Sequence, residues 1–163
     1  MRTIKAEKLT HEAFSPFGTF YSMTEPDGYA LKGELHRFFP DRVSESYPVR
    51  VGFSPILVKK PERMQITQVE YHTTTPEMIL PLNDDCILHV APASAGTPLP
   101  DMTKVFIVPK GTLVKIHTAI WHLAPLPVSA EELQAMIILP ECTYANDCTV
   151  VDLKEEEQFE IVL

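Results

Sequence analysis

The sequence has few basic residues and few cysteines. Lysine and arginine total 14 against 22 aspartate and glutamate residues, which gives a formal net charge of −8. Such a charge repels the phosphate backbone and argues against nucleic acid as a partner. The three cysteines, Cys86, Cys142 and Cys148, lack the C-x-x-C spacing of a zinc knuckle, and their odd number argues against a disulfide framework. Free thiols in a reducing compartment are expected.

Long apolar runs are also missing. No stretch approaches the roughly 18 apolar residues of a membrane span, and residues 1–10 lack the apolar core of a secretory signal. We therefore expect a cytoplasmic protein that does not bind membranes. The length of 163 residues predicts one domain covering residues 1–163.

Proline is the residue in excess. It occupies 15 of 163 positions, whereas glycine occupies only 6. The usual share of proline is about 5%. Proline ends helices and is kept out of central strands, so the count excludes a helix bundle and predicts many short segments joined by stiff corners.

Short runs typical of strands follow one another and are separated by proline, asparagine, aspartate or glycine. They cover residues 3–9, 49–53, 65–72, 78–82, 86–91, 105–108, 112–116 and 135–139. This spacing predicts an all-β sandwich or barrel. Thr10 is a candidate N-cap for one helical turn, and Ser129 with Glu132 fits the capping box of a second short helix. Residues 21–36 are polar and predict an exposed excursion.

One predicted strand carries an alternating pattern. Glu70 and His72 share one face with Gln68, and Val69 and Tyr71 share the other. If the apolar face packs on a second sheet, the polar face is solvated. If the sheet closes into a barrel, the polar face can line the interior and form a ligand site.

Two segments carry candidate chemistry. In the first, Glu70, His72 and Glu77 lie on either side of a threonine-rich turn, and two carboxylates with an imidazole could bind a divalent metal or transfer protons. In the second, His117 and His122 follow a predicted tight turn at residues 109–111, and His122 adjoins Trp121, the only tryptophan. A plain structural role for each segment stays open at this point.

These residues resemble the cupin motifs. Glu70, His72 and Glu77 stand at the histidine, histidine and glutamate of the first motif, and residues 109–111 resemble the P-x-G of the second. The sequence is more closely similar to the ureidoglycolate lyase family, which it matches at Glu70, His72, Pro81, His117, Trp121 and His122 and in residues 9–18. The resemblance implies a cupin-type double-stranded β-helix, a jelly-roll barrel with a few short helices.

The sequence also departs from these patterns, beginning with Glu70 at a histidine position and with Glu77 where the lyase family often has glutamine. Val114 stands where the second cupin motif has a metal-binding histidine, so the four-ligand site of dioxygenase cupins is incomplete. Tyr71, Ala119 and Leu123 stand where the lyase family has arginine, glycine and histidine. These departures leave the substrate more open than the fold.

The resemblance implies a lyase that splits ureidoglycolate, or a similar small acid, into urea and glyoxylate in purine and allantoin catabolism. It implies proton transfer by His72 and His122 with the help of Glu70, and a homodimer. Because carboxylates would repel an anionic substrate, we expect a divalent ion, nickel, manganese or zinc, on Glu70, His72, Glu77 and His122. The alternative is a cupin that binds a small acid or sugar as a sensor without turnover.

The remaining candidates are weaker. His117 and Trp121 are expected near the substrate, and His36 is an outside candidate because the adjacent Arg37 could contact a carboxylate. His11 and His89 are expected to be structural, and Cys86 to be an inert core thiol. Cys142 and Cys148 could pair, although two free thiols are the simpler expectation.

Overall fold

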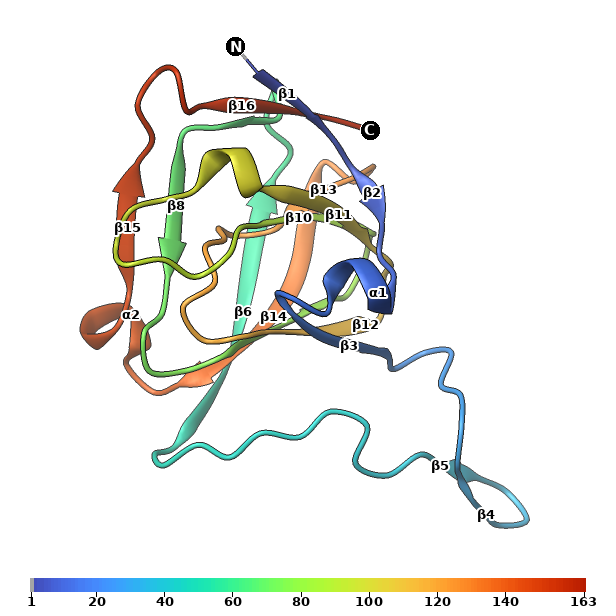
Figure 1. The fold of residues 1–163 in the computed structure, drawn as a ribbon. Helices are drawn as coiled ribbons and strands as arrows, with labels where there is room; N and C mark the ends of the chain where they lie inside the picture. Colours follow the sequence, from blue (N-terminus) through green and yellow to red (C-terminus); the bar gives the residue numbers. More distant parts are fainter. Residues whose placement is uncertain (1) are drawn as a thin grey trace.

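The computed structural model describes residues 2–163 as a β-barrel with one long arm (Figure 1). The strands are β1 (Arg2–Lys5), β2 (Glu7–Lys8), β3 (Gly18–Ser22), β4 (Leu31–Lys32), β5 (Arg37–Phe38), β6 (Val51–Lys59), β7 (Gln65–Ile66), β8 (Gln68–Tyr71), β9 (Glu77–Pro81), β10 (Cys86–Val90), β11 (Lys104–Val108), β12 (Thr112–Ile116), β13 (Leu126–Pro127), β14 (Glu132–Pro140), β15 (Thr149–Asp152) and β16 (Phe159–Val162). The helices are α1 (His11–Phe14), α2 (Thr143–Asn146) and the 3-10 turn η1 (Pro100–Met102). The all-β barrel with a few short helices predicted from the sequence is confirmed.

Two sheets form the body of the barrel. The larger has the order β3-β12-β9-β14-β6, and the second has the order β13-β10-β11-β2. A two-stranded sheet of β15 and β8 joins the second through residues 121–122, because Glu70 pairs with His122 and Ala91 pairs with Trp121. The chain between β12 and β13 thus crosses next to β8, which places two distant segments side by side.

Alternation along the strands divides the core into two parts. Leu88 of β10 and Phe106 of β11 belong to a cluster that also contains Ile79 of β9 and residues of β12 and β14. The neighbouring Ile87 faces the other way and joins a second cluster with Trp121 and residues of β8 and β16. Since adjacent strand residues point to opposite faces, β10 is buried on both sides, and all five of its residues are buried.

Proline and glycine lie at the predicted corners. At the turn between β11 and β12, the amide of Thr112 donates to the carbonyl of Pro109 over 3.0 Å. Gly111 has a φ of +76°, a conformation that residues with a Cβ rarely adopt. The N-cap prediction also holds, because the Thr10 hydroxyl accepts from the amide of Ala13 at 3.2 Å.

The predicted helix at Ser129 is wrong. Residues 129–131 form a bend, and β14 already begins at Glu132. The amides of Ser129 and Ala130 donate to the Asp84 carboxylate at 2.6 and 2.8 Å. A carboxylate from a distant loop therefore binds the amide of Ser129, which the Glu132 side chain would have satisfied in a capping box.

Both ends of the described chain belong to the barrel wall. β16 pairs in parallel with β1, and it buries Phe159 and Ile161. Glu155 and Glu156 lie exposed in the turn between β15 and β16. Among residues 2–163, no helix has the length and apolarity needed to cross a membrane.

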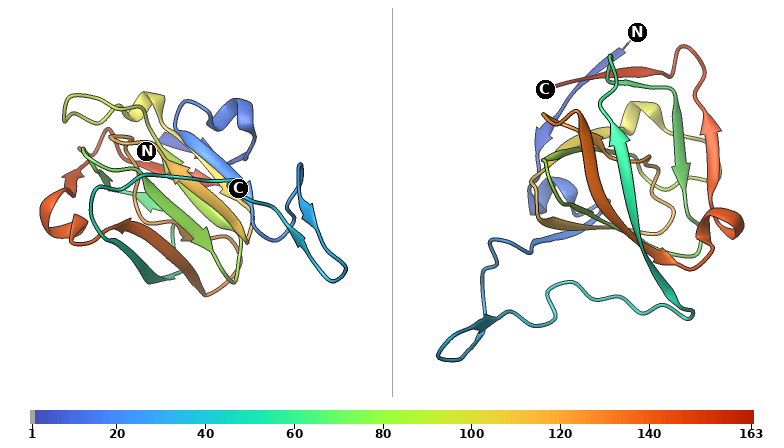
Figure 2. Two further views of the ribbon diagram at one scale, coloured as in Figure 1. Left: turned by 90° about the horizontal axis from the view of Figure 1, so that it is seen from below. Right: turned by 180° about the vertical axis from the view of Figure 1, so that it is seen from behind.

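The predicted excursion is longer than expected. Residues 23–50 run away from the barrel, and the small β4–β5 hairpin lies at the far end (Figure 2). None of these residues is buried, and the arm exposes Leu35 and Phe38 by 94% and 57%. Where the arm returns to the barrel, Val43 and Tyr47 pack on the outer face of the large sheet, against Met78 and neighbouring residues.

Burial of His89 on β10 leads to a prediction about acid stability. Its Nε2 atom has no hydrogen-bond partner among residues 2–163, and burial, with the nearby charge of His122, lowers its pKa to about 3. The unfolded chain takes up a proton near pH 6.5, so stability present above that pH is lost as the pH falls toward 3. At pH 5 the loss is about 2 kcal/mol.

Between pH 7.5 and pH 5, we therefore expect the free energy of unfolding of His89→Leu to fall by about 2 kcal/mol less than that of the wild type, measured by urea unfolding. The matched control is His11→Leu, because His11 is exposed and stacks on Phe20. Equal losses in the wild type and His89→Leu would contradict this account of His89.

Candidate active site

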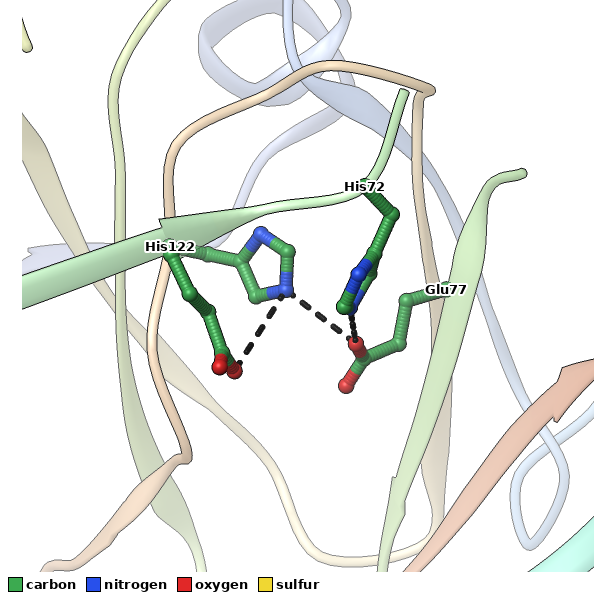
Figure 3. A group of neighbouring side chains, drawn as sticks. His72, Glu77 and His122 are labelled. Atoms are coloured by element: carbon green, nitrogen blue, oxygen red, sulfur yellow. Dashed lines mark hydrogen bonds and ion pairs between the residues drawn. The ribbon is translucent and has the colours of Figure 1, made fainter. Parts of the chain in front are cut away.

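Four polar side chains converge inside the barrel. Figure 3 shows three of them, His72, Glu77 and His122, pointing toward one another. Glu70 lies on β8, His72 directly follows that strand, Glu77 begins β9, and His122 lies in the segment that crosses beside β8. Each residue offers one ligand atom, and these atoms all lie within 4.8 Å of one another. His72, Glu77 and His122 are buried, and Glu70 has a side-chain exposure of 14%.

Glu77 lies at the centre of the group. Its Oε2 atom is 2.9 Å from Nε2 of His72 and 3.1 Å from Nε2 of His122. An Oε1–Nε2 distance of 4.0 Å separates Glu70 from His122. Among residues 2–163, the ion pairs of these two glutamates are made with histidines and include no lysine or arginine.

Both imidazole rings are oriented by main-chain carbonyl groups. Nδ1 of His72 lies 2.7 Å from the carbonyl oxygen of Asp147, and Nδ1 of His122 lies 2.8 Å from that of Ile120. A carbonyl oxygen only accepts, so each Nδ1 carries the proton. Each Nε2 then faces Glu77 with a lone pair, unless a second proton or a cation lies between them.

The electrostatics follow from this arrangement. Burial by itself would raise the pKa of Glu77, but the charge and hydrogen bonds of His122 and His72 outweigh it and hold that pKa at about 2. Burial would lower the pKa of His122, and the adjacent Glu77 raises it instead. Without a metal, the group is therefore a buried carboxylate that shares a proton with imidazole.

The donor set fits a divalent transition metal. Two imidazole nitrogens and two carboxylate oxygens suit nickel, manganese or zinc. In metal sites the ring nitrogen that does not bind the ion donates to a carbonyl or a carboxylate, and both histidines already do so here. A cation would also remove the conflict between the lone pairs of Nε2 and the carboxylate of Glu77.

Comparison with known proteins agrees with the geometry. The sequence profile described as ureidoglycolate lyase matches residues 1–160. The chain belongs to the ureidoglycolate lyase family. The resemblance noted from the motifs is thereby confirmed over nearly the whole chain.

Individual relatives are distant but match over nearly their full length. Ureidoglycolate lyase of Pseudomonas aeruginosa (strain LESB58) is 25% identical over 164 residues, covering 97% of this chain and 95% of that protein. Ureidoglycolate lyase of Pseudomonas fluorescens (strain Pf0-1) is 24% identical over 162 residues, covering 97% and 96%. Among solved structures, a mutant of Bacillus subtilis oxalate decarboxylase is similar with a TM-score of 0.45 and 18% identity, covering 64% of this chain and 24% of that chain.

The structure brings together the four predicted metal ligands but not the three predicted substrate residues. Trp121 points to the opposite face from His122, packs on Tyr71 with ring centroids 4.3 Å apart, and donates to Ser94. His117 is exposed in the turn after β12. His36 is exposed in the hairpin at the far end of the arm (Figure 1).

Val114 stands where the second cupin motif has a metal-binding histidine, and the structure gives it a role in the core. Its side chain is fully buried in the apolar core between the two main sheets, where it pairs with Ile79. His122, eight residues further along the chain, supplies an imidazole to the site from a different segment. Position 114 therefore contributes no ligand to the site, and the second imidazole comes from His122 instead.

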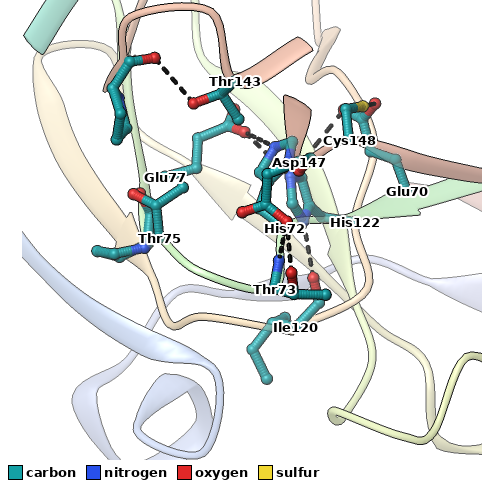
Figure 4. A network of polar contacts seen from close by, with 12 residues as sticks. Glu70, His72, Thr73, Thr75, Glu77, Ile120, His122, Thr143, Asp147 and Cys148 are labelled. Atoms are coloured by element: carbon teal, nitrogen blue, oxygen red, sulfur yellow. Dashed lines mark hydrogen bonds and ion pairs between the residues drawn. The ribbon is translucent and has the colours of Figure 1, made fainter. Parts of the chain in front are cut away.

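The sequence did not reveal one element of the site, the segment from Cys142 to Cys148 (Figure 4). The Asp147 carbonyl accepts from His72, and the Cys148 thiol donates to Glu70 over 3.4 Å. Burial and the charge of Glu70 raise the pKa of Cys148 to about 12, so this thiol is protonated. All three cysteines are free, and burial raises the pKa of Cys86 to about 12, which fits its predicted inertness.

Tyr144 in the same segment is 60% exposed, with its ring centroid 6.4 Å from that of His72. Burial of part of the side chain, with the charges of Glu77 and Glu70, raises its pKa. The only sequence signal for this segment was the Thr-Thr-Thr turn that Asp147 contacts.

Ala119 occupies a strained position beside the site, which leads to a stability prediction. Its φ is +65°, and its amide donates to the carbonyl of His72 over 2.7 Å. The left-handed region costs an L-residue with a Cβ about 1–2 kcal/mol, part of which is offset because glycine is more flexible when unfolded. We expect Ala119→Gly to stabilise the protein by roughly 0.5–1 kcal/mol, seen as a melting temperature higher by about 1–4 °C. A lower melting temperature would contradict the strain.

Proposed function

We propose that the protein is a lyase that cleaves ureidoglycolate into glyoxylate and urea, within purine and allantoin catabolism. One observation carries this proposal. In a member of the ureidoglycolate lyase family, two histidines and two glutamates from separate segments meet inside the barrel with their ligand atoms within 4.8 Å.

The chemistry of the substrate assigns the roles. Ureidoglycolate has one carbon that carries a hydroxyl, a carboxylate and the ureido nitrogen. Cleavage removes the hydroxyl proton, breaks the carbon–nitrogen bond and returns a proton to the departing nitrogen. Hence one carboxylate that accepts the first proton and delivers it to the nitrogen completes the balance.

Glu70 is the best placed group for this transfer. It is the most exposed member of the group, and among residues 2–163 its side chain accepts one hydrogen bond, from the Cys148 thiol at 3.4 Å. His72, Glu77 and His122 would hold a divalent ion together with Glu70. When bound, that ion would offset the charge of the two glutamates and attract the substrate carboxylate. His72 and His122 are the alternative proton carriers in a metal-free site, because the Nε2 atom of each lies within hydrogen-bond distance of the Glu77 carboxylate.

The test measures both products. Purified protein, with and without added nickel, manganese or zinc, is incubated with ureidoglycolate, and urea and glyoxylate are quantified. We expect equimolar release that depends on the ion. Saturable binding of ureidoglycolate without release would instead favour a sensor, the alternative considered from the sequence.

We also propose a cytoplasmic homodimer with no nucleic-acid partner. The three free cysteines suit a reducing compartment, and the net charge of −8 opposes binding to phosphates. The arm supports a dimer, because an isolated two-stranded hairpin with exposed Leu35 and Phe38 is marginally stable without a partner. Light scattering is expected to give twice the 18.4 kDa mass of one chain, and a mass of 18.4 kDa would refute the dimer.

A further inference from the structure

The carboxylate of Asp147 accepts four hydrogen bonds from two adjacent residues. Oδ1 accepts from the amide of Thr73 at 2.8 Å and from the Thr73 hydroxyl. Oδ2 accepts from the amide of Thr74 at 2.8 Å and from the Thr74 hydroxyl. We call this arrangement the Asp147 clasp. It joins the segment 142–148 to the turn that directly follows His72 (Figure 4).

The clasp holds the segment that contacts two of the four site residues, His72 and Glu70. The carbonyl of Asp147 itself accepts from Nδ1 of His72 at 2.7 Å, which sets the ring so that Nε2 points at Glu77. The next residue, Cys148, donates its thiol to Glu70 over 3.4 Å. A shift of Asp147 would therefore disturb the orientation of both an imidazole and a carboxylate.

Other interactions hold this segment weakly. Within residues 142–148 only Thr143 is buried, and α2 is a single turn of four residues. Cys142 has a φ of +65° and Asp147 has φ −148° and ψ 41°, so neither end of the turn has regular geometry. Hydrogen bonds within the turn and from the Thr143 hydroxyl to the Pro140 carbonyl are local, whereas the contacts of the Asp147 carboxylate with Thr73 and Thr74 tie the segment to the chain beside His72.

We propose that Asp147 is a positioning residue for the metal centre: its clasp on Thr73 and Thr74 fixes the carbonyl that orients His72 and the thiol that orients Glu70. Partners of this kind in metal sites change metal affinity about 10–100-fold when removed. The inference rests on the proposed metal-dependent function, and one of its readouts does not require a metal.

The chain offers a matched control on the pair of strands that adjoins the clasp, β15 and β8. Asp152, at the other end of β15, accepts from Gln68 on β8 over 2.6 Å and is exposed. Asp152→Asn makes the same chemical change as Asp147→Asn away from the site. A second pair of variants changes the donors: Thr73→Val with Thr74→Val removes both hydroxyls, and Thr73→Ser with Thr74→Ser keeps them.

The first measurement uses metal-free protein. Nitrogen-15 NMR of the histidine rings reports whether His72 holds its proton on Nδ1. We expect a single Nδ1–H form in the wild type, in Asp152→Asn and in the double serine variant. We expect loss of that form, or a mixture of tautomers, in Asp147→Asn and in the double valine variant. The second measurement titrates nickel, manganese or zinc calorimetrically, and we expect affinity to fall about 10–100-fold in the same two variants only.

The outcomes separate the two proposals. If the wild type binds none of the three ions, the metal proposal fails, and the NMR signal still decides whether the clasp orients His72. If the wild type binds a metal and Asp147→Asn matches Asp152→Asn in both tautomer and affinity, the positioning role is overturned. If Asp147→Asn fails to fold, the double valine variant with its serine counterpart decides the question by the same two readouts.

Discussion

His72→Ala is expected to abolish stoichiometric metal binding and to lower turnover of ureidoglycolate by roughly 10²–10⁴-fold. The reason is geometric: Nε2 of His72 lies 2.9 Å from the central Oε2 of Glu77, and its ring is held by the Asp147 carbonyl. Removing the ring deletes one of the four ligands and leaves a cavity in a buried site. Metal content per chain by elemental analysis and glyoxylate release measure the two effects.

Two other histidines provide matched controls. His36→Ala and His117→Ala remove exposed imidazoles outside the group of four, and both should keep the metal content and turnover of the wild type. Circular dichroism establishes that each variant is folded. Unchanged metal content together with unchanged turnover in His72→Ala would disprove the assignment of the site. A strong loss of turnover in His36→Ala would indicate that the substrate contacts the arm.

The four residues of the candidate metal site were predictable from the sequence in large part because two short-range patterns place three of them. Strand alternation puts Glu70 and His72 on one face, and the turn that follows returns the chain so that Glu77 enters the next strand beside them. The family resemblance added His122. Closure of the sheet into a barrel then decided between a solvated face and an interior site.

The same alternation limits what adjacency in sequence can predict. Trp121 and His122 are neighbours, but they belong to an extended segment that pairs on both sides, with Ala91 and with Glu70. Consecutive side chains therefore point to opposite faces. Trp121 packs in the second apolar cluster, and His122 joins the four polar residues of the site. A motif that contains both residues does not give both the same role.

Contacts between distant segments were not predictable. Asp147 lies 74 residues from Thr73, and neither local pattern refers to the other. The capping box at Ser129 failed for the same reason, since Asp84, 45 residues away, satisfies the amide of Ser129. Local propensity describes an isolated segment. In the folded chain, a carboxylate can accept hydrogen bonds from any segment that the fold places next to it.

Glu77→Gln tests the electrostatic centre of the site through stability. In metal-free protein the lowered pKa of Glu77 contributes stability above its ordinary value of 4.5, and this contribution is lost as the pH falls toward 2. The raised pKa of His122 contributes stability below 6.5, and this contribution is lost as the pH rises through the raised value. Both contributions are therefore present between pH 4.5 and pH 6.5.

We accordingly expect Glu77→Gln to cost about 3 kcal/mol near pH 5.5, from the shift of Glu77 between 4.5 and about 2, measured by urea unfolding with a chelator present. At alkaline pH, above the raised pKa of His122, that proton is lost and the lone pair on its Nε2 faces the Glu77 carboxylate, so the same substitution should cost much less. Glu160→Gln, which removes the surface pair with Arg63, is the control and should show no comparable pH dependence. A cost that is the same at both pH values would mean that Glu77 shares no proton with His122, and the site would then be a packed polar core rather than a centre built around a charge.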